Sequence, residues 1–436
     1  MNHLAAWDRF GKMTYDDLPS HVAQVANQCI LDWFGCALAG SNEPLSGILR
    51  SQFGHRSGPC TVIGKDLTVE APTAALLNGA SGHALDYDDT GSSVGCHSTA
   101  PVLPAVLAVA EDIGATGKEL IAALVVGVEV QGRINYAMGR DHYPKGWHTT
   151  ATYGTFGATA GVAHLLQLSK QQYSVAMGLA ASHASGVKAN FGTMTKPLHP
   201  GRSAESGVNC ARLAAAGFTA NPEAVLGNQG FVQAASNPDD ATGRLADVAQ
   251  DWLILGTLFK YHAACHLTHS AIESVLSLRT KLEVDDLSSL TITVHPGLLD
   301  ICGIPEPKTG LEGKFSLRGT ASLALNGIDT ANPETYVDTI IGGSAVQALI
   351  PKVTVETDDS LGSFQSKVVW VDAAQNAHEQ FNDLSKPVTD YHTQGEKLAL
   401  KFDSLCQFSG NDSKVEARKV AGLPTAARVS IGATGT

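Results

Sequence analysis

Runs of small residues at helical spacing dominate the first half of the chain. Alanine-rich and glycine-rich stretches carry apolar side chains three and four positions apart at residues 20–39, 70–85, 101–113, 117–139, 150–167, 171–185 and 202–217. This spacing predicts helices. Because small side chains let helix axes approach closely, we expect these helices to form one compact all-helical body.

The pattern changes after about residue 250. Residues 287–297, 351–359 and 365–373 alternate β-branched and polar side chains, which predicts strands. Helical spacing at 266–281 and 314–326 predicts helices that cover one face of a small antiparallel sheet, and it returns at 387–421. The predicted fold class is mostly α: a large all-helical domain (1–253 and 388–436) plus a smaller α+β domain (254–387). Residues 422–436 have no periodicity and are expected to fray.

Composition excludes several classes of protein. Of 436 residues, 44% are apolar and 17% charged, which is typical of a globular chain with ample core. The net charge of −12 argues against nucleic acid or an anionic membrane surface as partner. No apolar run reaches membrane-spanning length and no secretory signal opens the chain, so a cytoplasmic location is expected. The eight cysteines lack CxxC spacing and are expected to be free, buried thiols.

A short segment between two predicted helices concentrates positive charge. Residues 183–203, HASGVKANFGTMTKPLHPGRS, contain Lys188, Lys196, His183 and His199 among glycines and prolines. Glycine and proline predict a loop here, so the segment is expected to form a cationic turn suited to an anionic ligand. The alternative is an ordinary connection whose lysines face water.

An acidic motif follows one of the predicted helices. HALDYDDT, residues 83–90, places Asp86 and Asp89 three positions apart on one expected helical face, with Asp88 directed elsewhere. Such a cluster is compatible with a metal site, a carboxylate of shifted pKa, or groups that orient a histidine. A solvated helix end is the alternative.

Histidines occur in two further patterns. His97 and His148 each lie in a loop directly before a predicted helix, beside backbone N–H groups that suit a neutral imidazole next to an anion. His262, His266 and His269 are spaced to line one helix face, as helical metal ligands do. Because HExxH and any acid inside this cluster are absent, capping or ligand binding is favoured there and no metal is expected.

In combination, these motifs resemble the MmgE/PrpD family, which includes 2-methylcitrate dehydratase, cis-aconitate decarboxylase and iminodisuccinate epimerase. The resemblance rests on HALDYDDT with His97 and STAPVLPA, KGWHTTATYGTFGA, GVKANFGTMTKPLHPGR, FKYHAACHLTHSAIE and KFSLRGTASLAL, in family order across about residues 5–400. It implies a homodimer with a large helical domain and a smaller α+β lid. The implied polar pocket consists of Asp86, Thr90, His97, His148 and Lys196, with Lys260 and Cys265 at the lid edge.

Two positions depart from the family pattern. Cys265 stands where the decarboxylases carry a histidine, although His266 is adjacent, and Arg318 stands where a tyrosine is common. Both differences weigh against strict cis-aconitate decarboxylase activity.

The resemblance implies proton transfer at a carbon next to a carboxylate. Such chemistry needs cations on the carboxylate oxygens and a base of near-neutral pKa. Lys196, helped by Arg318 or Lys188, is expected to clamp carboxylates, and His148 and His97 to serve as base and acid. Asp86 would orient one imidazole, and Thr90 would donate a hydrogen bond.

The leading hypothesis is a cofactor-independent hydro-lyase, a dehydratase acting on a 2-methylcitrate-like polycarboxylate. An epimerase or isomerase of a dicarboxylate such as iminodisuccinate, or a decarboxylase of cis-aconitate, is the alternative within the same chemistry. From other classes, a metal-dependent hydrolase would use Asp86, Asp89 and the 262–269 histidines, and a non-catalytic relative would only bind polycarboxylates. Expected partners are a small di- or tricarboxylate and a second copy of the chain, with no nucleic acid, membrane or cofactor.

Overall fold

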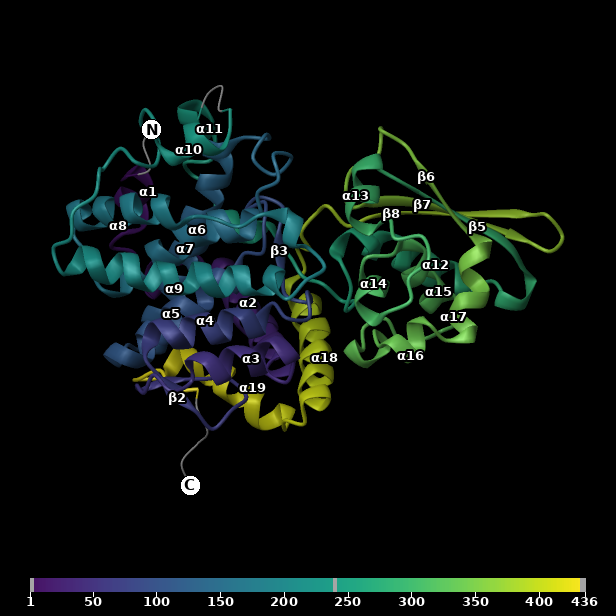
Figure 1. Cartoon of the computed structure of the whole chain (residues 1–436), viewed down its shortest axis with the longest axis horizontal. Helices are drawn as coiled ribbons and strands as arrows, with labels where there is room; N and C mark the ends of the chain where they lie inside the picture. Colours follow the sequence, from purple (N-terminus) through teal and green to yellow (C-terminus); the bar gives the residue numbers. More distant parts are fainter. Residues whose placement is uncertain (1–3, 238–240, 432–436) are drawn as a thin grey trace. The chain divides into compact units, whose positions relative to one another are not determined.

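The computed structural model describes residues 4–237 and 241–431, and their contacts define two compact units. The first, the helical unit, comprises residues 1–84, 88–259 and 388–436, as far as these are described; the second, the mixed unit, comprises 85–87 and 260–387. Figure 1 labels the elements of both units. The fold class predicted from sequence, mostly α with a smaller α+β part, is confirmed. Within the predicted frayed tail, 432–436 lie outside the described residues, whereas Leu423–Thr425 form a short 3₁₀ helix.

Helices build the first unit almost alone. They are α1 (Leu4–Phe10), α2 (Ser20–Gly40), α3 (Pro44–Phe53), α4 (Ala71–Gly82), α5 (Thr99–Ile113), α6 (Gly117–Met138), α7 (Thr149–Leu165), α8 (Lys170–His183), α9 (Thr195–Ala215), α10 (Phe231–Ala235), α11 (Ala241–Asp247), α18 (Tyr391–Ser409) and α19 (Ser413–Gly422). Two antiparallel pairs of very short strands join them, β1 (Cys60–Thr61) with β2 (Thr68–Val69) and β3 (Thr90–Gly91) with β4 (Thr257–Leu258). The late helix α18 packs on α2, so chain segments far apart in sequence complete one core (Figure 1).

Helix α7 is the centre of the helical unit. It packs against α5, α6, α8 and α9, and every residue in it except His164 is buried. Its sequence, TTATYGTFGATAGVAHL, is apolar or small on all sides, as expected for a helix with neighbours on every face. A central helix of this kind fixes its first residues firmly, and His148 immediately precedes it.

Glycine allows α4 and α9 to pack closely. A Cβ added at Gly79 would lie 2.7 Å from the Cα of Gly201, and one added at Gly201 would lie 2.4 Å from the carbonyl oxygen of Leu76. Only glycine fits at such an approach. This contact places the end of α4 next to the start of α9, where two of the basic residues of the 183–203 segment lie.

The loop predicted for 183–203 is only partly correct. Helix α9 begins at Thr195 and not near 202, so Lys196 and His199 stand on its first turns. Pro197 lies in the first turn, where a backbone N–H has no helical partner to lose. Pro200 lies inside the helix and has no backbone N–H, so one helical hydrogen bond is missing there. Packing against α4 and α7 stabilises the helix despite that loss.

The mixed unit is a four-stranded sheet with helices on it. Its strands, β5 (Leu287–Val294), β6 (Val353–Thr357), β7 (Gln365–Asp372) and β8 (Ala377–Asp383), follow the order β6-β5-β7-β8. The helices are α12 (His269–Arg279), α13 (Leu299–Cys302), α14 (Gly310–Lys314), α15 (Leu317–Leu325), α16 (Asp338–Ile341) and α17 (Ser344–Leu349). Helix α12 packs on β7 and β8, and α15 packs on β6.

The predicted antiparallel sheet is wrong in one pairing. Strands β5 and β6 run parallel, whereas β5–β7 and β7–β8 are antiparallel. The helical connection between β5 and β6 is long enough for the crossover that a parallel pair requires. Strand β8 was not predicted, because AHEQFND is polar and none of its residues is buried.

Two further sequence predictions can be compared with the structure. All eight cysteines are free and buried, as predicted. Among the described helices, α6 is long and apolar enough to cross a membrane, which the sequence analysis did not anticipate. However, 89% of its most apolar window is buried inside the structure, as in the core helix of a globular protein.

Candidate active site

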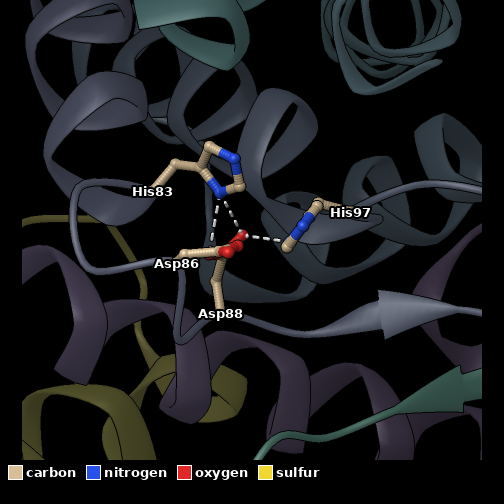
Figure 2. A group of neighbouring side chains, drawn as sticks. All are labelled: His83, Asp86, Asp88 and His97. Atoms are coloured by element: carbon tan, nitrogen blue, oxygen red, sulfur yellow. Dashed lines mark hydrogen bonds and ion pairs between the residues drawn. The ribbon is translucent and has the colours of Figure 1, made fainter. Parts of the chain in front are cut away.

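One buried carboxylate joins two imidazoles at the end of α4. Asp88 Oδ1 lies 2.8 Å from His83 Nδ1, and Asp88 Oδ2 lies 2.9 Å from His97 Nδ1 (Figure 2). His83 is the residue that ends α4, and His97 directly precedes the capping residue of α5. The side chains of Asp88 and His83 are fully buried, and the side chain of His97 is 11% exposed. Two helix ends therefore hold one ionisable network in place.

The backbone of this motif is not helical. Helix α4 stops at Gly82, and Asp86 has a left-handed φ of 52°. The shared helical face expected for Asp86 and Asp89 is thus wrong, because the tight turn after Gly82 directs these acids to different neighbours. Asp89 accepts hydrogen bonds from the backbone N–H groups of Ser98 and Thr99 and from the Thr99 hydroxyl, and so caps α5.

A second pair of imidazoles lies at the start of α7 and α9. His148 Nδ1 and His199 Nδ1 are 2.8 Å apart, so one ring donates Nδ1–H and the other accepts it. The His148 backbone N–H donates to Gly186 O, and the Phe191 ring meets the His148 ring edge-on at 4.9 Å. The His83 ring lies 6.2 Å from that of His148, which places the two pairs side by side in the helical unit.

Burial and nearby positive charge keep this second pair neutral. Burial, reinforced by the Lys196 ammonium, lowers the pKa of His148 well below its ordinary value. Burial also lowers the pKa of His199 to about 4, with His83 and Lys196 adding to the effect. Lys196 is itself only 8% exposed, and its ammonium group lies 5.4 Å from the centre of the Phe191 ring. Near neutral pH these rings act as neutral hydrogen-bonding groups.

The neighbouring acids differ in their protonation. Burial alone would raise the pKa of Asp88, but the imidazoles of His83 and His97 hold it well below its ordinary value. Burial, with repulsion from Asp32, raises the pKa of Asp89 to about 7 despite the bonds from Thr99. Of two adjacent aspartates, one is a stable anion and the other is easily protonated.

The remaining predicted residues of the helical unit lie in strands and loops. The Thr90 hydroxyl is 3.5 Å from Leu258 O, where β3 pairs with β4. The Lys188 ammonium lies 3.8 Å from the centre of the Tyr143 ring, a cation–π contact. The rings of His97 and His148 lie 4.3 and 6.2 Å from that of His83, and Lys196 and His148 both contact the Phe191 ring. His97, His148 and Lys196 are therefore close together in the helical unit.

The other predicted residues belong to the mixed unit, and Asp86 is one of them. Lys260 Nζ donates to both the carbonyl oxygen and Oδ1 of Asp86, at 2.7 and 2.9 Å. Cys265 is buried and precedes the short 3₁₀ helix His266–Thr268. Arg318 lies in the first turn of α15 and is partly exposed.

The 262–269 histidines form their own cluster in the mixed unit. The His269 ring lies 4.9 Å from that of His262 and 4.8 Å from that of His266. His262 Nδ1 contacts the Thr330 hydroxyl at 2.8 Å and its Nε2 contacts Glu273 at 3.1 Å, whereas His269 Nε2 contacts Ala264 O at 3.2 Å. The expected helical row is only partly formed, because α12 begins at His269.

The Asp88 group contains residue types that bind metal ions. Within the helical unit, His83, Asp88 and His97 offer two imidazoles and a carboxylate, which are donor types that also bind metal ions. Within the helical unit, however, the Nδ1 atoms of both histidines already meet Asp88 oxygens at hydrogen-bonding distances. Direct hydrogen bonds account for this arrangement.

Three residues of the site were missed or misassigned by sequence reasoning. His83 and His199 were not proposed for catalysis, and Asp88 was expected to point away from the cluster. The carboxylate that receives two imidazoles is Asp88, whereas Asp86 pairs with Lys260. The available signal was the spacing in HALDYDD: a histidine at a helix end and an acid five positions later can meet when the chain turns between them.

Comparisons with known proteins agree with the motifs. The family described as MmgE/PrpD N-terminal domain matches residues 3–244, and that described as MmgE/PrpD C-terminal domain matches residues 262–423. Human cis-aconitate decarboxylase is 30% identical over 416 residues, covering 91% of this chain and 85% of the human protein. Aspergillus terreus cis-aconitate decarboxylase is 29% identical over a match that covers 69% of this chain and 67% of the Aspergillus terreus protein. The cis-aconitate decarboxylase-like protein oryM of Aspergillus oryzae is 29% identical over a match that covers 78% of this chain and 76% of oryM.

Proposed function

This chain belongs to the MmgE/PrpD family, and from that premise we propose that it is a carboxy-lyase removing carbon dioxide from a cis-aconitate-like unsaturated tricarboxylate. The relatives named as cis-aconitate decarboxylases favour this alternative over the hydro-lyase that the motifs alone put first. The observation that carries the proposal is the grouping of an anion-backed imidazole, a neutral imidazole pair and a buried ammonium within the helical unit.

The chemistry requires a proton donor and cationic stabilisation. The carboxylate that leaves sits on a methylene carbon next to the double bond. When its C–C bond breaks, the electron pair forms a new double bond to the central carbon, and the old double bond shifts charge onto the far carbon. A proton from the enzyme then adds there, giving methylidenebutanedioate and carbon dioxide. Charge develops beside a second carboxylate, so cations and N–H donors at its oxygens lower the barrier.

The residues can be assigned to these tasks. His97 is the proposed proton donor, because the anionic Asp88 on its Nδ1 stabilises the charged ring. Lys196 is the proposed clamp for a substrate carboxylate. His148, neutral because of burial and Lys196, is the proposed hydrogen-bond partner of a second carboxylate.

A dehydratase is the second candidate. Cys265 stands where decarboxylases of this family carry a histidine, and Arg318 stands where a tyrosine is common. These departures lie in the mixed unit and leave the helical-unit residues unchanged, so they bear on which group leaves and not on the acid that delivers the proton.

One experiment separates the candidates. The purified protein is incubated in heavy water with cis-aconitate, 2-methylcitrate, citrate or iminodisuccinate and followed by NMR. We expect cis-aconitate to lose carbon dioxide and to gain one deuterium on the carbon that receives the proton, and His97→Gln to abolish both. Loss of water from 2-methylcitrate without carbon dioxide would identify the dehydratase, and exchange at iminodisuccinate alone would identify the epimerase. No reaction with any of the four would refute the proposal.

A further inference from the structure

One ring nitrogen of His83, Nε2, is buried and has no hydrogen-bond partner among the described residues. Its Nδ1 meets Asp88, and Figure 2 shows Nε2 on the side of the ring away from that carboxylate. No described residue makes a hydrogen bond to Nε2, which is also shielded from solvent. A buried polar atom left unpaired destabilises a folded protein, so a group that can pair with it is favoured there.

The bond to Asp88 determines what His83 can do. Because Asp88 is an anion, it accepts Nδ1–H from both His83 and His97. The bond at Nδ1 therefore leaves Nε2 as the atom of His83 that a ligand can meet. The same anion stabilises positive charge close to it in this buried network.

The groups around His83 set the charge that a ligand meets. From the turn after α4 and the start of α5 come Asp88, Asp89 and His97; from α2, packed on α4, comes Asp32, which is paired with Lys401. From the starts of α7 and α9 come His148, His199 and Lys196. Asp88 carries a negative charge and Lys196 a positive charge, so the charges of these two groups nearly cancel. A trianion bound there would favour protonation of an Asp88-backed ring.

We propose that His83 is a further ligand-binding residue of this site: its ring takes up a proton when a polycarboxylate binds, and Nε2–H donates to one carboxylate of that ligand. This inference rests on the proposed function in that it takes the ligand to be a polycarboxylate. It differs from the role given to His97, which delivers a proton to carbon, because the His83 proton stays on the ring and neutralises ligand charge.

The test measures proton uptake on binding. The probe is tricarballylate, the saturated analogue of cis-aconitate, which has no double bond to accept the electrons of decarboxylation. Isothermal titration calorimetry at pH 7 in two buffers of different ionisation enthalpy gives the number of protons taken up. For the unaltered protein we expect about one proton per bound ligand, and weaker binding as pH rises.

Two substitutions separate a direct contact from a merely positioning role. In His83→Asn the amide nitrogen replaces Nδ1 and keeps the bond to Asp88, but nothing replaces Nε2. In His83→Gln the amide replaces Nε2 but cannot be protonated. We expect both to lose proton uptake, with His83→Asn weakening binding about 10- to 100-fold and His83→Gln recovering part of that loss. His164→Asn, at the other end of α7, is the control for changing a histidine of the same unit and should behave like the unaltered protein.

Several outcomes would overturn the inference. They are binding by the unaltered protein without proton uptake, undiminished uptake in His83→Asn, and no binding of millimolar tricarballylate. A stoichiometric divalent ion in the purified protein that is lost in His83→Asn would also overturn it, because the cluster would then hold a metal. The measurement on the unaltered protein stands even if a variant does not fold.

Failure of this inference is distinguishable from failure of the proposed function. If cis-aconitate is not decarboxylated but tricarballylate binds with uptake that depends on His83, the inference stands and the reaction assignment falls. If decarboxylation is observed and proton uptake does not depend on His83, the reaction assignment stands and the inference about His83 falls.

Discussion

Among the described residues, each unit holds a cluster of histidines, and the cluster in the helical unit combines a fully buried anion with a buried imidazole nitrogen that has no hydrogen-bond partner. The helical-unit cluster contains His83, His97, His148 and His199; the mixed-unit cluster contains His262, His266 and His269. Ring separations are similar in the two. The helical-unit cluster includes a fully buried anion, Asp88, whereas the acid of the mixed-unit cluster, Glu273, has a side chain that is 42% exposed.

The hydrogen bonds reinforce this contrast. Both nitrogens of His262 have partners within the mixed unit, and burial, with His266 and His262 adding to it, lowers the pKa of His269 well below its ordinary value. In the helical unit, His83 keeps a buried nitrogen that no described residue satisfies. The number of histidines is therefore a poor guide to function. A buried anion behind the ring, together with a nitrogen left for a ligand, distinguishes a candidate site from a structural cluster.

Among the substitutions that compare the two clusters, the largest effect is expected at His148. His148→Asn should reduce turnover of cis-aconitate roughly 100- to 1,000-fold, because the hydrogen bond between the neutral ring and a substrate carboxylate would be lost. Steady-state kinetics measures the turnover of the variant, and circular dichroism checks that the variant is folded. A folded variant that retains full turnover would show that His148 takes no part in the reaction and that the two clusters do not differ in this respect.

Lys196 tests the charge of the same cluster. Lys196→Met keeps much of the side-chain length without the ammonium and should lower kcat/KM about 100-fold. Loss of the charge should also raise the pKa of His148, since Lys196 is one cause of its depression. The pH profile of kcat/KM is the measurement. An unshifted profile with normal kcat/KM would show that the ammonium does not face the substrate.

The adjacent acids predict a pH dependence of stability. Folded Asp89 keeps its proton up to about pH 7, whereas in the unfolded chain it loses it near the ordinary 3.8. The folded state therefore binds more protons between these values, and this carboxyl makes the free energy of unfolding fall as pH rises through that window. Asp89→Asn should remove the fall and raise the free energy of unfolding at pH 8 by about 1–4 kcal/mol.

Urea unfolding at pH 5 and pH 8 measures the free energy of unfolding of Asp89→Asn and of the unaltered protein. Asp8→Asn, at an exposed aspartate, is the control. Asp88 affects the free energy of unfolding in the opposite direction, because its pKa is lowered in the folded state. It stabilises the folded protein at pH values above its ordinary pKa, and this stabilisation is lost as the pH falls through the lowered pKa. If Asp89→Asn leaves the difference between the two pH values unchanged, the two aspartates are not in different protonation states.

The smallest effect is expected in the mixed unit. His262→Asn keeps a donor for Thr330 and loses the bond to Glu273, so the free energy of unfolding should fall by about 0.5–1.5 kcal/mol. Turnover should change little. Because the same substitution is made at His148, the pair is a matched test, and an equal loss of turnover in both would end the distinction between the clusters.

Sequence reasoning reached the fold class because helical spacing and β-branched alternation are local signals. It placed α9 too late, because proline and glycine near residue 200 indicate a loop locally, and only the close packing on α4 shows why a helix fits there. It missed β8 for a similar reason, since a strand with no buried residue has no apolar alternation.

The candidate site was predicted in part. His97, His148 and Lys196 were recognisable from their loop contexts and from family motifs. Asp88 and His83 were not, because the turn at Asp86, with its left-handed backbone, reverses the direction expected from helical spacing. Which acid faces which histidine depends on that single backbone conformation.

A crystal structure of the protein with bound tricarballylate would show directly whether the helical-unit cluster binds a polycarboxylate. We expect the ligand to bind in the helical unit, with one carboxylate at His83 Nε2 and another within hydrogen-bonding distance of Lys196 Nζ. A ligand bound away from these groups, or a metal ion between His83, Asp88 and His97, would contradict it.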